Sequence, residues 1–195
     1  MTKKKILLIA VAVALVVFLA LSAKVIDVGT EGQYTGVVAF DAKTSSGGDW
    51  EKIVAEITDK AVGAETLEVA DFGKGRAVTL NGTVSDFSSK ANGKKNTLTV
   101  VPNGYTGDKT FIVQVGSIYT GTAVRDVQSV KTFGDFTNQT EWSQYAKALN
   151  SQLHEKAVVP LALSEGAKGK TIRLIGAATA SGNEISITPV TITLE

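Results

Sequence analysis

The sequence has no cysteine and only one histidine, His154. The lack of cysteine excludes disulfide bonds, thiol catalysis and cysteine-based zinc sites, and one histidine is too few for a multi-histidine metal site. Neither positively nor negatively charged residues are in clear excess. Without Lys3, Lys4 and Lys5, the 20 Lys and Arg fall to 17 against 19 Asp and Glu, a net charge of −2. We therefore expect no metal, no cofactor and no nucleic-acid partner.

Charge is also absent from Ile6 to Ala23, a run that directly follows the three lysines. As a helix this run is about 27 Å long, close to the hydrocarbon thickness of a bilayer. It is either a secretory signal, cleaved near Ser22 or Ala23, or an uncut anchor with the lysines in the cytoplasm. We favour the anchor, because cleaved signals usually have an apolar region of only about 7–15 residues.

Both interpretations assign residues 1–23 to a signal or anchor helix and residues 24–195 to an extracytoplasmic domain. The predicted location is the cell envelope. The protein is anchored in the cytoplasmic membrane and faces the periplasm or exterior, or it is secreted if the signal is cleaved. Mass spectrometry of the membrane fraction distinguishes the two, because an N-terminus at Ala23 or Lys24 rules out the anchor.

Apolar residues at helical spacing predict an amphipathic helix over Asp49–Val62, with Asp49 as N-cap and Gly63 at its end. A short helical turn over Leu67–Phe72 completes a helical insertion at about residues 43–76. Before the helix we expect a strand and a loop, over residues 24–42 and Thr44–Gly48. A second amphipathic helix is predicted over Asn138–Lys156.

From Ala77 onward the apolar residues recur with the period of two that is typical of strands. The predicted strands are Ala77–Leu80, Thr83–Phe87, Thr97–Val101, Lys109–Val115, Ile118–Val124, Val127–Val130, Thr171–Ala177 and Glu184–Leu194. Asn-Gly pairs at 81–82, 92–93 and 103–104 favour tight turns and hence a β meander. Many strands with two main helices predict a mainly β (α+β) fold, a barrel-like domain with helical additions.

Three patterns that suggest chemistry have simpler explanations. The segment Gly166–Thr171 imitates a phosphate-binding loop but precedes a predicted strand rather than a helix, so we interpret it as a hairpin turn. His154 has no nucleophile at a recognisable spacing. The carboxylates Glu51, Glu56 and Asp59 alternate with lysines, as on a solvated helix surface. We therefore predict no catalytic residue and expect that the protein is not an enzyme.

Polar and aromatic residues concentrate around the second helix, and two explanations stay open. In the structural one, Arg125 forks onto Asp135, and Asp135 or Thr137 caps the helix. In the functional one, planar amides and charges beside aromatic rings hold a sugar-like ligand. The candidate ligand-binding residues are Tyr119, Arg125, Asp126, Asn138, Gln139 and Trp142.

Several segments resemble a known family, the predicted periplasmic lipoproteins grouped as domain of unknown function 2291. The resemblance rests on Gly121–Asp126, Asp135–Gln139, Ala148–Asn150 and Ile187–Val190, with weaker matches at Phe40–Ala42, Trp50 and Val113–Gly116. It implies an OB-like β-barrel with a small helical subdomain around Asp49–Phe72. It also implies an extracytoplasmic location and genes that often lie beside sugar-type ABC transporters, but no activity. The family's lipid-carrying cysteine is replaced here by Ser22-Ala23, so lipid attachment does not carry over.

These observations favour a membrane-tethered accessory or ligand-binding protein without catalysis. Its expected partners are the membrane, through residues 1–23, and ABC transporter components or a sugar-like small molecule. The alternative is a structural or assembly protein of the envelope that acts through protein contacts. A hydrolase with an unrecognised site is the third hypothesis.

Overall fold

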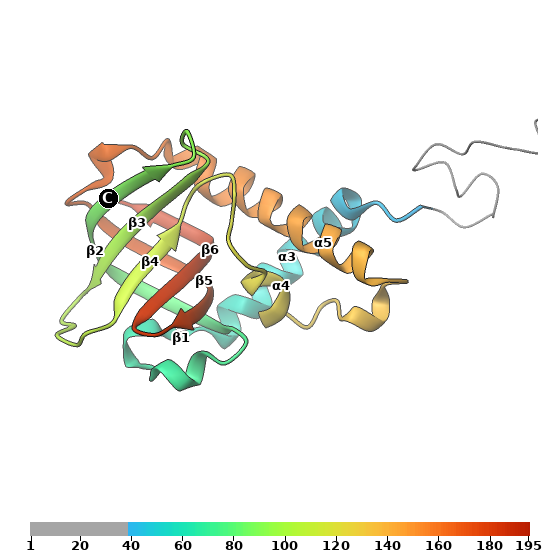
Figure 1. Cartoon of the computed structure of the whole chain (residues 1–195), viewed down its shortest axis with the longest axis horizontal. Coiled ribbons are helices and arrows are strands. Elements are labelled where there is room, and N and C mark those ends of the chain that lie inside the picture. The colour runs from blue at the N-terminus through green and yellow to red at the C-terminus, as the bar shows by residue number, and fades with distance from the viewer. Residues whose placement is uncertain (1–38) are drawn as a thin grey trace, which may run out of the picture. The chain divides into compact units, whose positions relative to one another are not determined.

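Five strands form a closed β-barrel in the computed structural model of the protein, which describes residues 39–195 (Figure 1). The strands are β2 (Arg76–Lys90), β3 (Lys95–Pro102), β4 (Thr110–Gln114), β5 (Thr171–Ser181) and β6 (Glu184–Leu194). Their order is β2-β3-β4-β6-β5, and β5 pairs back onto β2. The predicted membrane segment and residues 24–38 of the first predicted strand lie outside the described residues. Within residues 39–195, no helix has both the length and the apolar character needed to cross a bilayer.

The barrel closes because the 15-residue strand β2 pairs with two partners. Its first half is antiparallel to β5 and its second half is antiparallel to β3, and the two pairings overlap at Gly82 and Thr83. The pairing of β4 with β6 is parallel. The two-residue strand β1 (Val62–Gly63) adds a short parallel pairing to β2.

The pair Asn81-Gly82 was predicted as a turn, but it lies in the middle of β2. Gly82 faces Pro102 on one side and Ile172 on the other. A Cβ atom at Gly82 would lie 2.3 Å from the carbonyl oxygen of Val101. Glycine is therefore needed here for the close approach of two backbones, not for a turn.

The other two Asn-Gly pairs do form turns, as predicted. Asn92 and Gly93 have φ angles of 55° and 80° in the β2–β3 connection, and Gly104 has φ 72° after β3. Positive φ is the property that makes Asn-Gly favourable in tight turns.

The barrel interior consists of alternate residues of each strand, as period-two patterning requires. Leu80, Leu98, Phe111, Ile172 and Ile187 are all fully buried. The predicted strand segments from Ala77 to Val115 and from Thr171 to Leu194 are thus confirmed in kind, although Ala77–Leu80 and Thr83–Phe87 belong to one strand.

Helix α3 (Ala42–Lys60) begins seven residues before the predicted start. The Asp41 carboxylate accepts hydrogen bonds from the backbone N–H groups of Lys43 and Thr44, so the N-cap is Asp41 and not Asp49. The expected loop Thr44–Gly48 is helical, and its Ser46 is fully buried. The end was also mispredicted, because α3 ends at Lys60 with Ala61 extended, while Gly63 lies in β1.

Two 3₁₀ turns, η1 (Ala64–Thr66) and η2 (Val69–Phe72), link β1 to the barrel. The second confirms the helical turn expected over Leu67–Phe72. Together with α3 these turns form the helical segment that precedes β2.

The strands predicted over Ile118–Val124 and Val127–Val130 are wrong. The chain instead forms a loop and then the short helix α4 (Ala123–Val127). The buried Gln114 side chain holds this loop, since its amide oxygen accepts from Thr120 N–H at 2.6 Å. The apolar spacing of Ala123, Val124 and Val127 fits a helix as well as a strand, and five residues are too few to separate the two periods.

Helix α5 (Gln139–Leu153) confirms the second predicted helix and continues into the π-helical segment η4 (His154–Val158). Its N-cap is Asn138, whose side-chain oxygen accepts from the backbone N–H of Glu141 at 3.0 Å. Asp135 and Thr137, the predicted caps, do not take this role. Helices α3 and α5 pack together (Figure 1), and the buried Tyr145 hydroxyl donates to the Asp49 carboxylate at 2.9 Å.

Candidate functional site

An open hollow of about 560 Å³ lies beside helix α4, and we name it the α4 hollow. It is lined by Lys74, Arg125, Asp126, Gln128, Lys131, Thr132, Phe133 and Trp142. Three of the six predicted ligand-binding residues, namely Arg125, Asp126 and Trp142, therefore lie together. They are brought together because α4 packs on α5 and the start of β2.

Arg125 is held by three partners at the rim of this hollow. Its guanidinium lies 2.6 Å from the carboxylate of Asp126 and 3.1 Å from the hydroxyl of Thr122. It also lies over the ring of Trp142, 4.6 Å from the centroid. The predicted fork onto Asp135 is not formed, because the Asp135 carboxylate accepts from the backbone and hydroxyl of Thr132. These bonds lower the pKa of Asp135.

Trp142 belongs to an aromatic cluster that leaves little of its ring free. Phe136 lies 5.0 Å from it, and Tyr145 stacks on it at 6.1 Å with an interplanar angle of 12°. Phe133 meets its edge at 6.4 Å and is itself 51% exposed. A ligand that stacks on an aromatic face in this hollow would thus meet Phe133 rather than Trp142.

The α4 hollow carries a net positive charge. Asp126 is neutralised by Arg125, whereas Lys74 and Lys131 form no ion pair within residues 39–195. The Gln128 side chain is buried and already used, since it donates to the carbonyls of Arg125 and Lys131. The polar groups left for a ligand are therefore mainly ammonium groups.

The other three predicted residues do not join this hollow. Asn138 caps α5, and Gln139 is the exposed first residue of that helix. Tyr119 lies in the loop before α4, where its hydroxyl is 3.3 Å from Nδ1 of His154. Burial raises the pKa of Tyr119, so its hydroxyl stays protonated in the physiological range.

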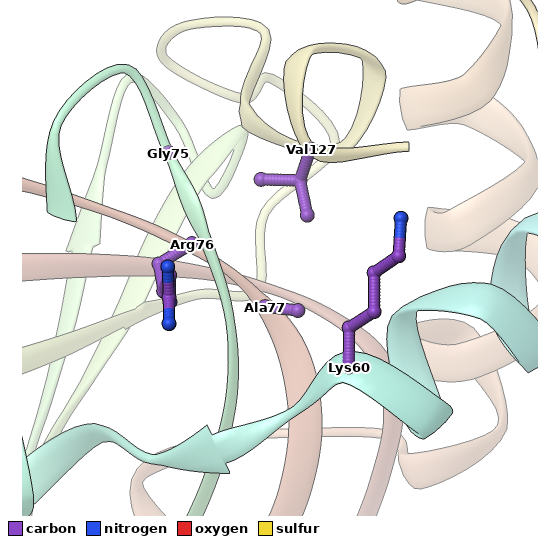
Figure 2. A pocket seen from close by; sticks show the side chains of 5 residues that line it. All are labelled: Lys60, Gly75, Arg76, Ala77 and Val127. Atoms are coloured by element: carbon purple, nitrogen blue, oxygen red, sulfur yellow. The ribbon is translucent and has the colours of Figure 1, made fainter. Parts of the chain in front are cut away.

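A second hollow of about 330 Å³ lies at the start of β2 and is lined by Lys60, Gly75, Arg76, Ala77 and Val127. Figure 2 shows Lys60 extending from the end of α3 toward Val127, with the Gly75–Ala77 stretch opposite. Gly75 has φ 148°, and a Cβ atom there would lie 2.9 Å from Val127. Glycine at this position therefore lets α4 approach the start of β2.

Glu56 ties α3 to the segment after α4, which corrects its prediction as a fully solvated residue. Its carboxylate accepts from the backbone N–H and the hydroxyl of Ser129, at 2.9 and 2.6 Å, and pairs with Lys60 at 2.5 Å. Burial acts to raise the pKa of Glu56, but these hydrogen bonds and the charge of Lys60 outweigh it, so the pKa lies below its ordinary value of 4.5.

Sequence reasoning missed Lys74, Lys131 and Phe133. The signal available was the glycine-flanked lysine in Gly73-Lys74-Gly75, which marks an exposed turn. Among residues 39–195, no group of three or more His, Asp or Glu side chains could hold a metal ion.

Comparison with solved structures identifies the fold as an OB-fold barrel. An OB-fold protein from Thermotoga maritima matches this chain with a TM-score of 0.57 at 17% identity. The alignment covers 80% of this chain and 99% of the Thermotoga chain. Weaker likenesses, which support no argument, are an OBody bound to hen egg-white lysozyme and the S. pombe Stn1-Ten1 complex. The OBody match has a TM-score of 0.31 at 15% identity, and the alignment covers 61% of this chain and 93% of the OBody chain. The Stn1-Ten1 match has a TM-score of 0.31 at 9% identity, and the alignment covers 61% of this chain and 57% of that chain. No curated protein matches the chain.

Residues 73–193 match the family model of domain of unknown function 2291, described as predicted periplasmic lipoproteins. The chain belongs to this family, so the resemblance inferred from its motifs is confirmed. The family's description supports the extracytoplasmic location predicted from the N-terminus, and the protein is an envelope protein. Anchoring through residues 1–23 stays a prediction.

Proposed function

We propose that the protein is a non-catalytic binding protein of the envelope, and that its α4 hollow holds an anionic, sugar-like solute for an ABC-type uptake system. The observation that carries the proposal is the exposed ring of Phe133 beside the ammonium groups of Lys74 and Lys131. A sugar ring packs its C–H groups on an aromatic face, and a carboxylate or phosphate pairs with lysine. The transport link comes from the family resemblance.

The test is a thermal-shift panel with matched neutral and anionic sugars, such as glucose, glucuronate and glucose 6-phosphate. The anionic members should raise the melting temperature, because only a ligand that binds the folded state stabilises it. Phe133→Ser and the pair Lys74→Gln with Lys131→Gln should each weaken binding about tenfold. Lys90→Gln, on an exposed residue at the end of β2, is the control and should leave binding unchanged. If no sugar shifts the melting temperature and nothing of a transporter co-purifies, the proposal fails.

A second candidate is an assembly protein that acts through protein contacts. It is favoured by the open form of the α4 hollow and by the half-exposed Phe133 at its edge. Cross-linking in intact cells distinguishes the two functions. An assembly role predicts that Phe133→Ser abolishes a protein cross-link while no sugar stabilises either form.

A further inference from the structure

A third hollow, of about 280 Å³, lies where the open end of the barrel meets the C-terminal end of α5, and we name it the mouth hollow. It is lined by Gly93, Asn96, Val115, Gly116, Ser117, His154, Val158, Val159, Ala162 and Leu163. None of these side chains is a carboxylate, lysine or arginine. Its chemistry therefore differs from that of the cationic α4 hollow.

Asn96 is an unusual residue for its place in the barrel. It lies on β3 at the alternate positions that include the buried Leu98 and Val100, so it occupies the last inward-facing place before the barrel opens. Its side-chain oxygen Oδ1 is buried and accepts no hydrogen bond within residues 39–195. Buried polar atoms nearly always have a partner, and an atom without one needs an explanation.

His154 supplies a second polar group to this hollow. Its Nδ1 lies 3.3 Å from the Tyr119 hydroxyl, and the two rings meet edge to face at 6.1 Å. The histidine ring is thus oriented by a neighbour. A neutral imidazole that accepts at Nδ1 carries its proton on Nε2 and can donate from there.

The segment that lines one side of the hollow has an irregular backbone. The π-helical η4 (His154–Val158) is followed by the 3₁₀ turn η5 (Val159–Leu161) and by Ala162, which has φ 46°. Single π turns occur often at functional sites, and a left-handed residue other than glycine is strained. Val159 is 56% exposed although it is apolar. Residues with these three features line the same hollow as Asn96.

We propose that the mouth hollow binds a small uncharged molecule that has an apolar body and a hydrogen-bond donor, of the class of primary amides and alcohols. The donor satisfies Oδ1 of Asn96, and His154 supplies the second polar contact. Val115, Val158 and Leu163 contact the apolar body. The lack of a charged lining group disfavours ions, because a desolvated charge needs a partner. Since Oδ1 is closed to solvent, the ligand reaches it when the segment His154–Leu161 moves outward.

The single histidine allows a direct test, because only one imidazole gives signals in an NMR spectrum of the whole chain. The probe is isobutyramide, and isobutyrate serves as a control of matched shape that is charged and has no N–H donor at pH 8. Isobutyramide should shift the His154 resonances in a saturable way, and isobutyrate should not. Equal shifts with both compounds, or no saturable shift with the amide up to its solubility limit, would overturn the proposal.

Two variants locate the site. Asn96→Leu removes the unpartnered oxygen, so it should weaken amide binding at least about tenfold while the melting temperature stays level or rises. Asn81→Leu, an exposed position on β2, is the matched control. Ser117→Trp fills the hollow from its exposed rim and should abolish the shift without touching the barrel interior, whereas Ser89→Trp should not. Unchanged binding in folded Asn96→Leu or Ser117→Trp protein would overturn the assignment.

Discussion

The Arg125 guanidinium lies over the Trp142 ring, 4.6 Å from its centroid, while the same group pairs with Asp126 at 2.6 Å. Two contacts of different kinds therefore fix its plane, and only a flat guanidinium makes both. This pairing connects α4 to α5 at the edge of the α4 hollow.

Arg125→Lys should therefore lower stability although it keeps the charge. We expect a loss of about 0.5–1 kcal/mol, because the stacking on Trp142 is weakened and lysine cannot replace the two guanidinium nitrogens, Nε and Nη2, that both contact Oδ1 of Asp126. Urea denaturation measures it. Arg173→Lys, on the exposed face of β5, should change stability little, and a similar loss in both variants would show that the stacked geometry is unimportant.

The Glu56 carboxylate gives a pH dependence whose sign follows from its pKa. Because the folded pKa lies below 4.5, this group stabilises the protein above that pH, and the contribution is lost as pH falls through the folded pKa. Glu56→Gln should cost about 1–2 kcal/mol at pH 7, and the deficit should shrink as the pH falls through the folded pKa of Glu56.

Denaturation curves at several pH values test this dependence. Glu51→Gln on the same helix is the control, because its ion pair with Lys156 is 3.4 Å long and its own side chain is 84% exposed. A deficit for Glu56→Gln that stays constant into acid would exclude a carboxylate effect.

Two glycine substitutions should act in opposite directions. Gly82→Ala places a methyl group 2.3 Å from the Val101 carbonyl oxygen, so it should destabilise the barrel by about 2 kcal/mol or more. Gly48→Ala lies in α3 with no atom within 4 Å of the new Cβ, so it should stabilise by about 0.5–1 kcal/mol. Melting temperatures of the two proteins test both expectations, and a stabilising Gly82→Ala would contradict the close approach of β2 and β3.

Asn138→Ala tests whether this residue serves as a helix cap or as a ligand-binding residue. As the N-cap of α5 it should contribute about 1 kcal/mol of stability, which Asn138→Asp should largely retain. Solute binding in the α4 hollow should be unaffected by either change. The neighbouring Gln139→Ala serves as the control, and loss of binding in a stable Asn138→Ala protein would restore the ligand role predicted from sequence.

The sequence predicted the barrel well where strands are long enough to show their period. The C-terminal strands and the Asn92-Gly93 turn were correct because both depend on local preferences of the backbone. The pair Asn81-Gly82 has the same two residue types but a different role. Its glycine is required by the close approach of the Val101 backbone, which is distant in sequence. Nothing local distinguishes the two pairs.

The errors in the helices have a similar origin. Two glycines and two serines suggested a loop before Asp49, yet packing of α3 against α5 makes that stretch helical and buries Ser46. Of the predicted ligand residues, Arg125 and Trp142 lie in contact because α4, which carries Arg125, packs against α5, which carries Trp142. Lys74 could not be foreseen as their neighbour, because 51 residues separate it from Arg125 and only barrel closure brings them together.

The barrel is closed, but its strands are not paired along their whole length. Within residues 39–195, strand β6 pairs with β4 only over Glu184–Ile187, and from Thr188 to Leu194 its register pairs it with β5 alone. A strand side without a partner strand holds backbone donors and acceptors that an extended peptide can use. Closure of the barrel by itself therefore does not bar an added strand, and point substitutions of side chains test only part of the recognition surface.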